Sequence, residues 1–122
     1  MKQKTLSLPA RMNSFGFAIR GISKFFQQEP NAWIHLVATV FVFLAAIYYH
    51  VSNSEKVALI IVTGFVWVSE IFNTVIERMM DFISEKRDPK IEYIKDLSAG
   101  GVLLSAISAI VTGAIIFIPK LF

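Results

Sequence analysis

The sequence predicts an all-α membrane protein that crosses the bilayer with three helices and carries an amphipathic helix before them. Of its 122 residues, 55% are hydrophobic, a larger share than soluble domains usually have. These residues are grouped in three long runs, each near the length that spans the ~30 Å hydrocarbon core of a bilayer. The length allows a single domain, and we expect residues 1–122 to form it.

The composition excludes several classes of protein. The chain has no cysteine, so disulfides and thiolate metal sites are excluded. The net charge of +3 is modest and accompanies much apolar surface, so it indicates orientation in a membrane and not nucleic-acid binding. The polar, basic N-terminal segment is not followed by a short apolar core with a small-residue cleavage site, so we expect no signal peptide.

Residues 13–28 are predicted to form an amphipathic helix on the inner membrane surface. Apolar residues recur there at helical spacing, and polar residues occupy the rest of the helical wheel. A juxtamembrane anchor without a chemical role is the alternative interpretation. The apolar positions are Phe15, Ile19, Ile22, Phe25 and Phe26, and the polar ones are Arg20, Lys24, Gln27 and Gln28.

Three apolar runs predict the membrane spans, at residues 32–49, 57–77 and 97–118. His35 is the clearly ionisable residue of the first run, and the third run carries no charge. The third run also has a stripe of small residues, which we interpret as a surface for close helix packing. The stripe consists of Ser98, Gly101, Ser105, Ser108, Ala109 and Thr112.

The basic residues outside these spans predict the orientation of the chain. Of the 12 lysines and arginines, all but Lys56 and Lys120 lie in the N-terminal segment or in residues 78–96. Cytoplasmic segments of membrane proteins are enriched in lysine and arginine. We therefore expect the N-terminus and residues 78–96 in the cytoplasm, and the C-terminus on the outer side.

The segment SEIFNTVIERMMD, residues 69–81, places acidic side chains at the end of the second apolar run. Glu70, Asn73, Glu77 and Asp81 follow one another at helical spacing, so they fall on or near one face of a helix. Glu70 is expected roughly 10 Å below the cytoplasmic boundary of the hydrocarbon core. Placing an acidic residue at the bilayer centre costs about 2.5–3.5 kcal/mol on insertion scales, which favours a functional role.

These residue types leave two classes of function open. Glu70 could act as a general base, and Glu77 or Glu29 could bind Mg²⁺, which prefers hard oxygen ligands. Lys95, next to Asp96 at the start of the third span, could neutralise phosphate charge. Such a set suits transfer of a phosphoryl group to a lipid hydroxyl, and it also suits a cation pathway. The structural alternative is that Glu70 is protonated or pairs with a cation to hold helices together.

A recognisable pattern is carried by three blocks of the sequence, EIFNTVIERMMD, KDLSAGGVLL and RMNSFGFAIRG. They resemble the blocks E-x-x-N-[ST]-A-[IV]-E-x-x-x-D, K-D-x-x-[AS]-[AG]-[AG]-V and R-x-x-S-F-x-x-A-x-x-G of small bacterial membrane lipid kinases. This is the prokaryotic diacylglycerol kinase and undecaprenol kinase family. The resemblance extends from Arg11 to the C-terminus, and it departs from the pattern at Val75, where the family usually has alanine.

The resemblance implies a homotrimer in the bacterial inner membrane, with active sites shared between protomers and with ATP and Mg²⁺ as donor and cofactor. The absence of a P-loop glycine pattern fits a kinase built without the usual nucleotide fold. In the implied site Glu70 is the base that takes the proton of the lipid hydroxyl. By the same resemblance Glu29 and Glu77 hold the metal, Asn73 and Asp81 support the site, and Lys95, Asp96 and Arg11 contact the nucleotide together with Glu29 and Glu77.

The resemblance also bears on the lipid substrate. Asn31 and His35 follow Glu29 as E-x-N-x-x-x-H, and this spacing and the closing IIFIPK look more like the undecaprenol branch. Undecaprenol is therefore favoured over diacylglycerol, with Asn31 and His35 near the substrate beside Glu70. A histidine that only bonds lipid headgroups is the alternative for His35. The alternatives for the whole chain are a diacylglycerol kinase that makes phosphatidic acid and, in a different class, a small oligomeric cation pore or transporter subunit.

Overall fold

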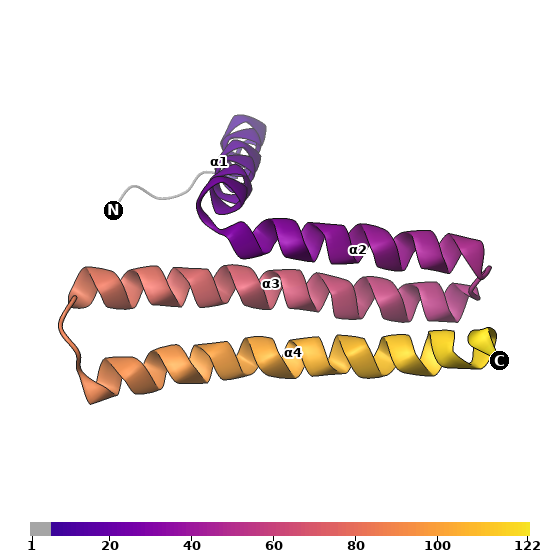
Figure 1. Ribbon diagram of the computed structural model, residues 1–122. Helices are drawn as coiled ribbons and strands as arrows, with labels where there is room; N and C mark the ends of the chain where they lie inside the picture. The colour runs from indigo at the N-terminus through magenta and orange to yellow at the C-terminus, as the bar shows by residue number, and fades with distance from the viewer. Residues whose placement is uncertain (1–5) are drawn as a thin grey trace. The chain divides into compact units, whose positions relative to one another are not determined.

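The computed structural model describes residues 6–122, so two of the predicted cytoplasmic basic residues, Lys2 and Lys4, lie outside the described residues. The chain runs through α1 (Leu8–Gln28), α2 (Pro30–Tyr48), α3 (Asn53–Ile83) and α4 (Pro89–Leu121), as Figure 1 shows. It divides into two compact units, and the boundary between them falls after Ala38. The first unit holds α1 and the beginning of α2, and the second holds the rest of α2 with α3 and α4.

The first helix begins at Leu8, earlier than the predicted start at residue 13, because the residues around it form an N-terminal cap. The hydroxyl of Ser7 accepts a hydrogen bond from the backbone N–H of Ala10 at 3.3 Å. Pro9 lies in the first turn, where its fixed φ suits a helix and its missing N–H costs nothing. The cap therefore adds more than a turn to the helix that the apolar periodicity predicts.

An aromatic corner joins α1 to α2 within the first unit. Glu29 breaks the helix with an extended backbone, and its N–H donates to the carbonyl of Phe25 at 2.9 Å. The indole N–H of Trp33 donates to the carbonyl of Phe26 at 3.0 Å, and the two rings meet edge to face with centroids 5.2 Å apart. These contacts set the path of the chain on either side of Glu29.

The connection between α2 and α3 explains why α2 ends at Tyr48. His50 has φ 51°, in the left-handed region that L-residues seldom adopt. The N–H of His50 donates to the carbonyl of Ile47 at 3.3 Å, and the N–H of Val51 donates to the carbonyl of Ala46 at 3.2 Å. This pair of bonds is the Schellman pattern that terminates helices.

The start of α3 is capped and is also linked to the end of α4. Ser52 and Glu55 form a capping box: the Ser52 hydroxyl accepts from the Glu55 N–H at 3.2 Å, and a Glu55 oxygen accepts from the Ser52 N–H at 3.0 Å. The other oxygen of the Glu55 carboxylate accepts from Lys120 Nζ at 2.7 Å. Beside this pair lies a small apolar core of Ala46, Val51, Leu59 and Ile116.

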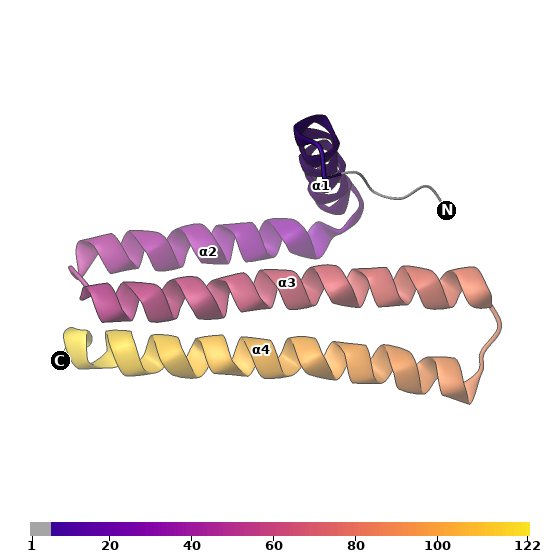
Figure 2. The ribbon, with the colours of Figure 1, turned by 180° about the vertical axis from the view of Figure 1, so that it is seen from behind.

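Helices α3 and α4 lie side by side and antiparallel, as Figures 1 and 2 show from opposite sides. Uncharged polar side chains also form hydrogen bonds between helices of the second unit. The hydroxyls of Ser69 on α3 and Ser105 on α4 are 2.8 Å apart, and the indole N–H of Trp67 donates to the Thr39 hydroxyl on α2 at 2.9 Å. Such bonds between apolar helices stabilise packing where lipid cannot compete for the polar groups.

Three of the helices, α2, α3 and α4, are long and apolar enough to cross a membrane. Each predicted span falls on one of them, and large apolar side chains such as Phe41 and Ile110 are more than 70% exposed. In a bilayer these side chains would face lipid instead of water. Helix α3 continues beyond its predicted span to Ile83, and α4 begins before its predicted span, at Pro89. The polar residues at these ends still favour a helix. The Asp88 side chain caps α4 by accepting a hydrogen bond from the Lys90 N–H at 2.8 Å.

Candidate active site

The polar residues predicted for one helical face all lie on α3. Glu70, Asn73 and Glu77 are half-buried, and Asp81 is exposed near the end of the helix. Asn73 Nδ2 donates to Glu77 Oε1 at 3.2 Å, which orients both side chains. Asn73 Oδ1 is buried and accepts no hydrogen bond from the residues that the structure describes. Because a buried acceptor without a donor is costly, a bound hydroxyl or water would find a ready partner there.

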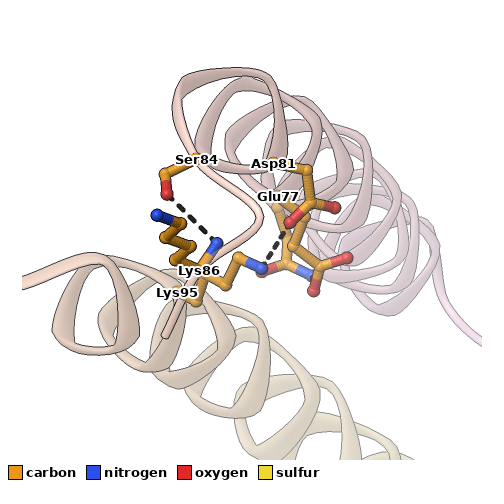
Figure 3. A network of polar contacts seen from close by, with 6 residues as sticks. Glu77, Asp81, Ser84, Lys86 and Lys95 are labelled. Atoms are coloured by element: carbon orange, nitrogen blue, oxygen red, sulfur yellow. Dashed lines mark hydrogen bonds and ion pairs between the residues drawn. The ribbon is translucent and has the colours of Figure 1, made fainter. Parts of the chain in front are cut away.

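Lys95 reaches from α4 to this face. Its Nζ lies 2.6 Å from Asp81 Oδ1, with Lys95 36% and Asp81 58% exposed, and Figure 3 shows the contact next to Glu77. An exposed ion pair of this kind contributes at most about 1 kcal/mol to stability. It does, however, hold an ammonium group beside carboxylates, which would otherwise repel the phosphates of a nucleotide. Asp96, the neighbour of Lys95, is exposed on α4.

The loop from Ser84 to Asp88 follows directly after this face. The Ser84 hydroxyl accepts from the backbone N–H of Lys86 at 3.1 Å, and Arg87 Nε donates to Glu92 at 2.7 Å (Figure 3 shows the first of these). The side chain of Lys86 is exposed. The loop therefore has a defined shape and presents further positive charge near Lys95.

The remaining candidate residues belong to the first unit. Arg11 is exposed on α1, Glu29 is half-buried at the corner between α1 and α2, and Asn31 and His35 lie in the first turns of α2, exposed and half-buried respectively. The carbonyl of Glu29 accepts from the N–H of Ala32 at 3.1 Å. The structure thus pairs Asn73 with Glu77 and Asp81 with Lys95. The other candidates, Arg11, Glu29, Asn31 and His35, belong to the first unit.

The carboxylates of α3 are compatible with Mg²⁺ in a specific way. In the described part of the chain no group of three or more His, Cys, Asp or Glu side chains gathers to hold a metal ion. Mg²⁺ commonly binds one or two carboxylates and completes its shell with water and substrate phosphates. Glu77, one turn before Asp81 on the same face of α3, offers a carboxylate for that arrangement.

Sequence reasoning missed the contacts that cross between helices. The Ser69–Ser105 and Trp67–Thr39 bonds join residues 36 and 28 positions apart, and their partners follow only from the packing of the helices. A partial signal was present: Ser105 belongs to the small-residue stripe of the third apolar run, and it is almost completely buried.

Comparison with known proteins decides the family. The family model for prokaryotic diacylglycerol kinase matches residues 16–117, which include Glu29, the acidic face of α3 and Lys95, but not Arg11. This chain belongs to the prokaryotic diacylglycerol kinase family. It is therefore a lipid kinase and a membrane protein, and the family decides between the enzyme and the cation pathway that the charges alone left open.

Two curated relatives of this kinase carry different substrate names. The undecaprenol kinase of Bacillus subtilis (strain 168) is 32% identical over 108 residues, covering 88% of this chain and 88% of the relative. A diacylglycerol kinase of a Synechocystis species is 31% identical over 114 residues, covering 93% of this chain and 65% of the relative. The two identities are nearly equal, so the family membership establishes a lipid kinase without selecting the lipid.

Proposed function

We propose that this lipid kinase transfers the γ-phosphoryl group of ATP, with Mg²⁺, to the hydroxyl of undecaprenol in preference to diacylglycerol. The observation that carries the proposal is the face of α3, where the half-buried Glu70 precedes the Asn73–Glu77 hydrogen bond and the Asp81–Lys95 ion pair. Along this face the surroundings change from an apolar helix to a charged loop. A site that brings a lipid tail and a water-soluble nucleotide together requires such a change. The E-x-N-x-x-x-H pattern of Glu29, Asn31 and His35 supports undecaprenol.

The proposed chemistry assigns the proton and the phosphoryl group to separate residues. Glu70 accepts the proton of the lipid hydroxyl, and the freed oxygen forms a bond to the γ-phosphorus of ATP. The bond between that phosphorus and the β–γ bridging oxygen breaks, and ADP leaves. The product is a lipid phosphate, and Glu70 returns its proton to water. Asn73 Oδ1, the buried unsatisfied acceptor, orients the incoming hydroxyl.

The charged end of the site would hold the nucleotide. Lys95 exchanges its contact with Asp81 for a phosphate oxygen, because a phosphate group carries more negative charge than a carboxylate. Glu77 and Glu29 would hold Mg²⁺ together with the phosphates, and Mg²⁺ would neutralise charge on the transferring group. Asp96 and Arg11 are assigned to nucleotide contact, and Asp81 to support of Lys95.

The setting of this chemistry is also part of the proposal. Chain 1–122 acts as one lipid kinase domain in the bacterial inner membrane, with residues 13–28 of α1 lying on the inner surface as an amphipathic helix. Three copies assemble, and neighbouring protomers share active sites. Such sharing is consistent with the shortage of metal-binding carboxylate clusters within the described part of one chain.

Diacylglycerol is the second candidate lipid, because one of the curated relatives is named for that activity. Both lipids present a primary hydroxyl on an apolar body, so the site chemistry is the same for either. The choice depends on how the helices accept the tail, and the first-unit residues Asn31 and His35 are the proposed contacts.

The test is phosphate transfer from labelled ATP by the purified protein in mixed micelles with Mg²⁺. Undecaprenol and diacylglycerol are offered in separate reactions, with Glu70→Gln as the control variant. We expect label mainly in undecaprenol phosphate, reduced by about a hundredfold or more in the variant, the usual scale for a general base. Label mainly in phosphatidic acid would reverse the substrate assignment, and normal turnover by the Glu70→Gln variant would remove Glu70 as the base.

A further inference from the structure

A hydroxyl pair joins α3 to α4 at the residue before the proposed base. The Ser69 and Ser105 oxygens are 2.8 Å apart, and Ser69 directly precedes Glu70 in α3. Ser105 has 1% of its surface exposed, and among residues 6–122 no other polar residue is buried. Apart from Glu70, the neighbouring positions of both helices are apolar, as in the runs VWVSEI and VLLSAI.

The protons of the pair can be assigned by counting. Ser69 Oγ also lies within bonding distance of the Val66 carbonyl, at 2.9 Å, and Ser105 Oγ of the Val102 carbonyl, at 2.7 Å. Each hydroxyl has one proton, so one serine donates across to the other helix while its partner donates to its own backbone. Removing one hydroxyl therefore breaks the crossing bond but leaves the other serine a carbonyl acceptor on its own helix. No buried polar group loses all of its partners.

The crossing bond restrains the rotation of α3 about its own axis. Consecutive residues of a helix differ by about 100° around the axis, so fixing the direction of Ser69 fixes the direction of Glu70. The ion pairs between α3 and α4, Asp81–Lys95 and Glu55–Lys120, lie near the two ends of these helices. The serine pair lies between these two ion pairs along the helices, at the level of the proposed base.

We propose that the Ser69–Ser105 hydrogen bond is a positioning contact that sets the direction of the Glu70 carboxylate toward the lipid hydroxyl. This inference rests on the proposed role of Glu70. Ser69 and Ser105 act through Glu70 and touch neither substrate. Their loss lowers the rate of the chemical step, whereas binding of ATP and lipid continues.

The kinetic test compares Ser105→Ala and Ser69→Ala with a matched control, Ser108→Ala. The Ser108 hydroxyl is exposed on the same helix and donates to the carbonyl of Leu104, one turn earlier, at 3.0 Å. We expect kcat to fall about three- to twentyfold in each of the first two variants, the range that interhelical hydrogen bonds in membranes are worth. KM for ATP and for lipid should stay within about twofold of the unmodified protein, and the control should match it throughout.

The double variant separates positioning from general damage. Because one bond is lost in all three cases, Ser69→Ala/Ser105→Ala should be no slower than the slower single variant. Multiplying effects, or a kcat of Ser105→Ala equal to that of the control, would overturn the inference. Unmodified protein that phosphorylates neither lipid would instead contradict the proposed function itself.

The contact has a test that does not depend on activity. The chain contains no cysteine, so a Ser69→Cys/Ser105→Cys variant has a single thiol pair. We expect oxidation in membranes to link the two positions within one chain and to shift the mobility of a fragment cleaved in the loop after Ile83. A variant whose two thiols both remain reactive toward a maleimide after oxidation would show that the serines are not in contact and would overturn the inference.

Discussion

Glu77 is held by Asn73 in a way that leaves most of its carboxylate available. One oxygen accepts from Asn73 Nδ2 at 3.2 Å, and the face continues to Asp81 one turn later. Glutamine in place of glutamate retains an oxygen that can accept this bond but removes the negative charge. The metal role of Glu77 can therefore be tested without dismantling the hydrogen bond.

We expect Glu77→Gln to raise the Mg²⁺ concentration needed for half-maximal activity by about tenfold or more, since each lost charge weakens the binding of a hard cation. The measurement is a Mg²⁺ titration of phosphate transfer at fixed ATP. Glu85→Gln, in the exposed loop, is the matched control and should leave the titration unchanged. An unaltered titration in the Glu77 variant would remove this residue from the metal site.

Lys95 is the cation that the structure holds at this face. Replacing it by alanine should raise KM for ATP about tenfold or more, because a hydrogen bond between charged groups contributes about 1.5–3 kcal/mol. KM for the lipid should change little, and steady-state kinetics with each substrate varied in turn would measure both. The exposed Lys56, at the other end of α3, provides the control variant Lys56→Ala. A larger effect on lipid than on ATP would assign Lys95 to lipid binding.

Charged side chains form caps and ion pairs at the ends of the helices. At the start of α3 the Glu55 carboxylate completes a capping box and receives Lys120 from α4, with about a quarter of each side chain exposed. At the start of α4, Glu92 pairs with Arg87 at the same 2.7 Å, but Arg87 is 86% exposed. Solvent screens the second pair more strongly, so equal distances correspond to unequal energies.

We predict that Glu55→Ala lowers the free energy of unfolding more than Glu92→Ala does, through loss of the cap and of the ion pair together. Glu92→Ala, which also breaks a 2.7 Å ion pair, should cost less than about 1 kcal/mol. Denaturation in detergent micelles followed by circular dichroism measures both. Equal losses in the two variants would show that the capping box and the partial burial add nothing.

The whole molecule is organised by the distribution of charge along its spans. The acidic face and Lys95 lie at one end of the α3–α4 pair, and the Glu55–Lys120 pair lies at the other. The concentration of lysine and arginine in residues 78–96 predicts that the acidic end faces the cytoplasm, where ATP is available. The orientation and the proposed activity therefore depend on the same segment.

Single cysteines test this orientation, because the chain has none of its own. A membrane-impermeant thiol reagent should label Ser54→Cys in intact cells and should label Glu85→Cys only after the membrane is opened. Both positions are exposed, so accessibility within the protein does not limit the reaction. The reverse pattern of labelling would place the proposed active site on the outer side and contradict the use of cytoplasmic ATP.

The sequence by itself determined that this protein has three long apolar helices, and that Glu70, Asn73, Glu77 and Asp81 share one face of the second. Both follow from local rules, the apolar length needed to cross lipid and the spacing of residues around a helix. The N-terminal helix was also visible in the apolar periodicity, although its start at Leu8 depends on a cap that periodicity does not report.

Only the tertiary structure decided which residues meet across helices. Lys95 on α4 contacts Asp81 on α3, and Ser69 on α3 contacts Ser105 on α4. Glu55 and Lys120 are 65 positions apart in sequence, and their contact depends on the relative register of α3 and α4. Periodicity gives the face of each helix but not how far one helix is shifted along another, because side-chain packing along the whole contact sets that shift.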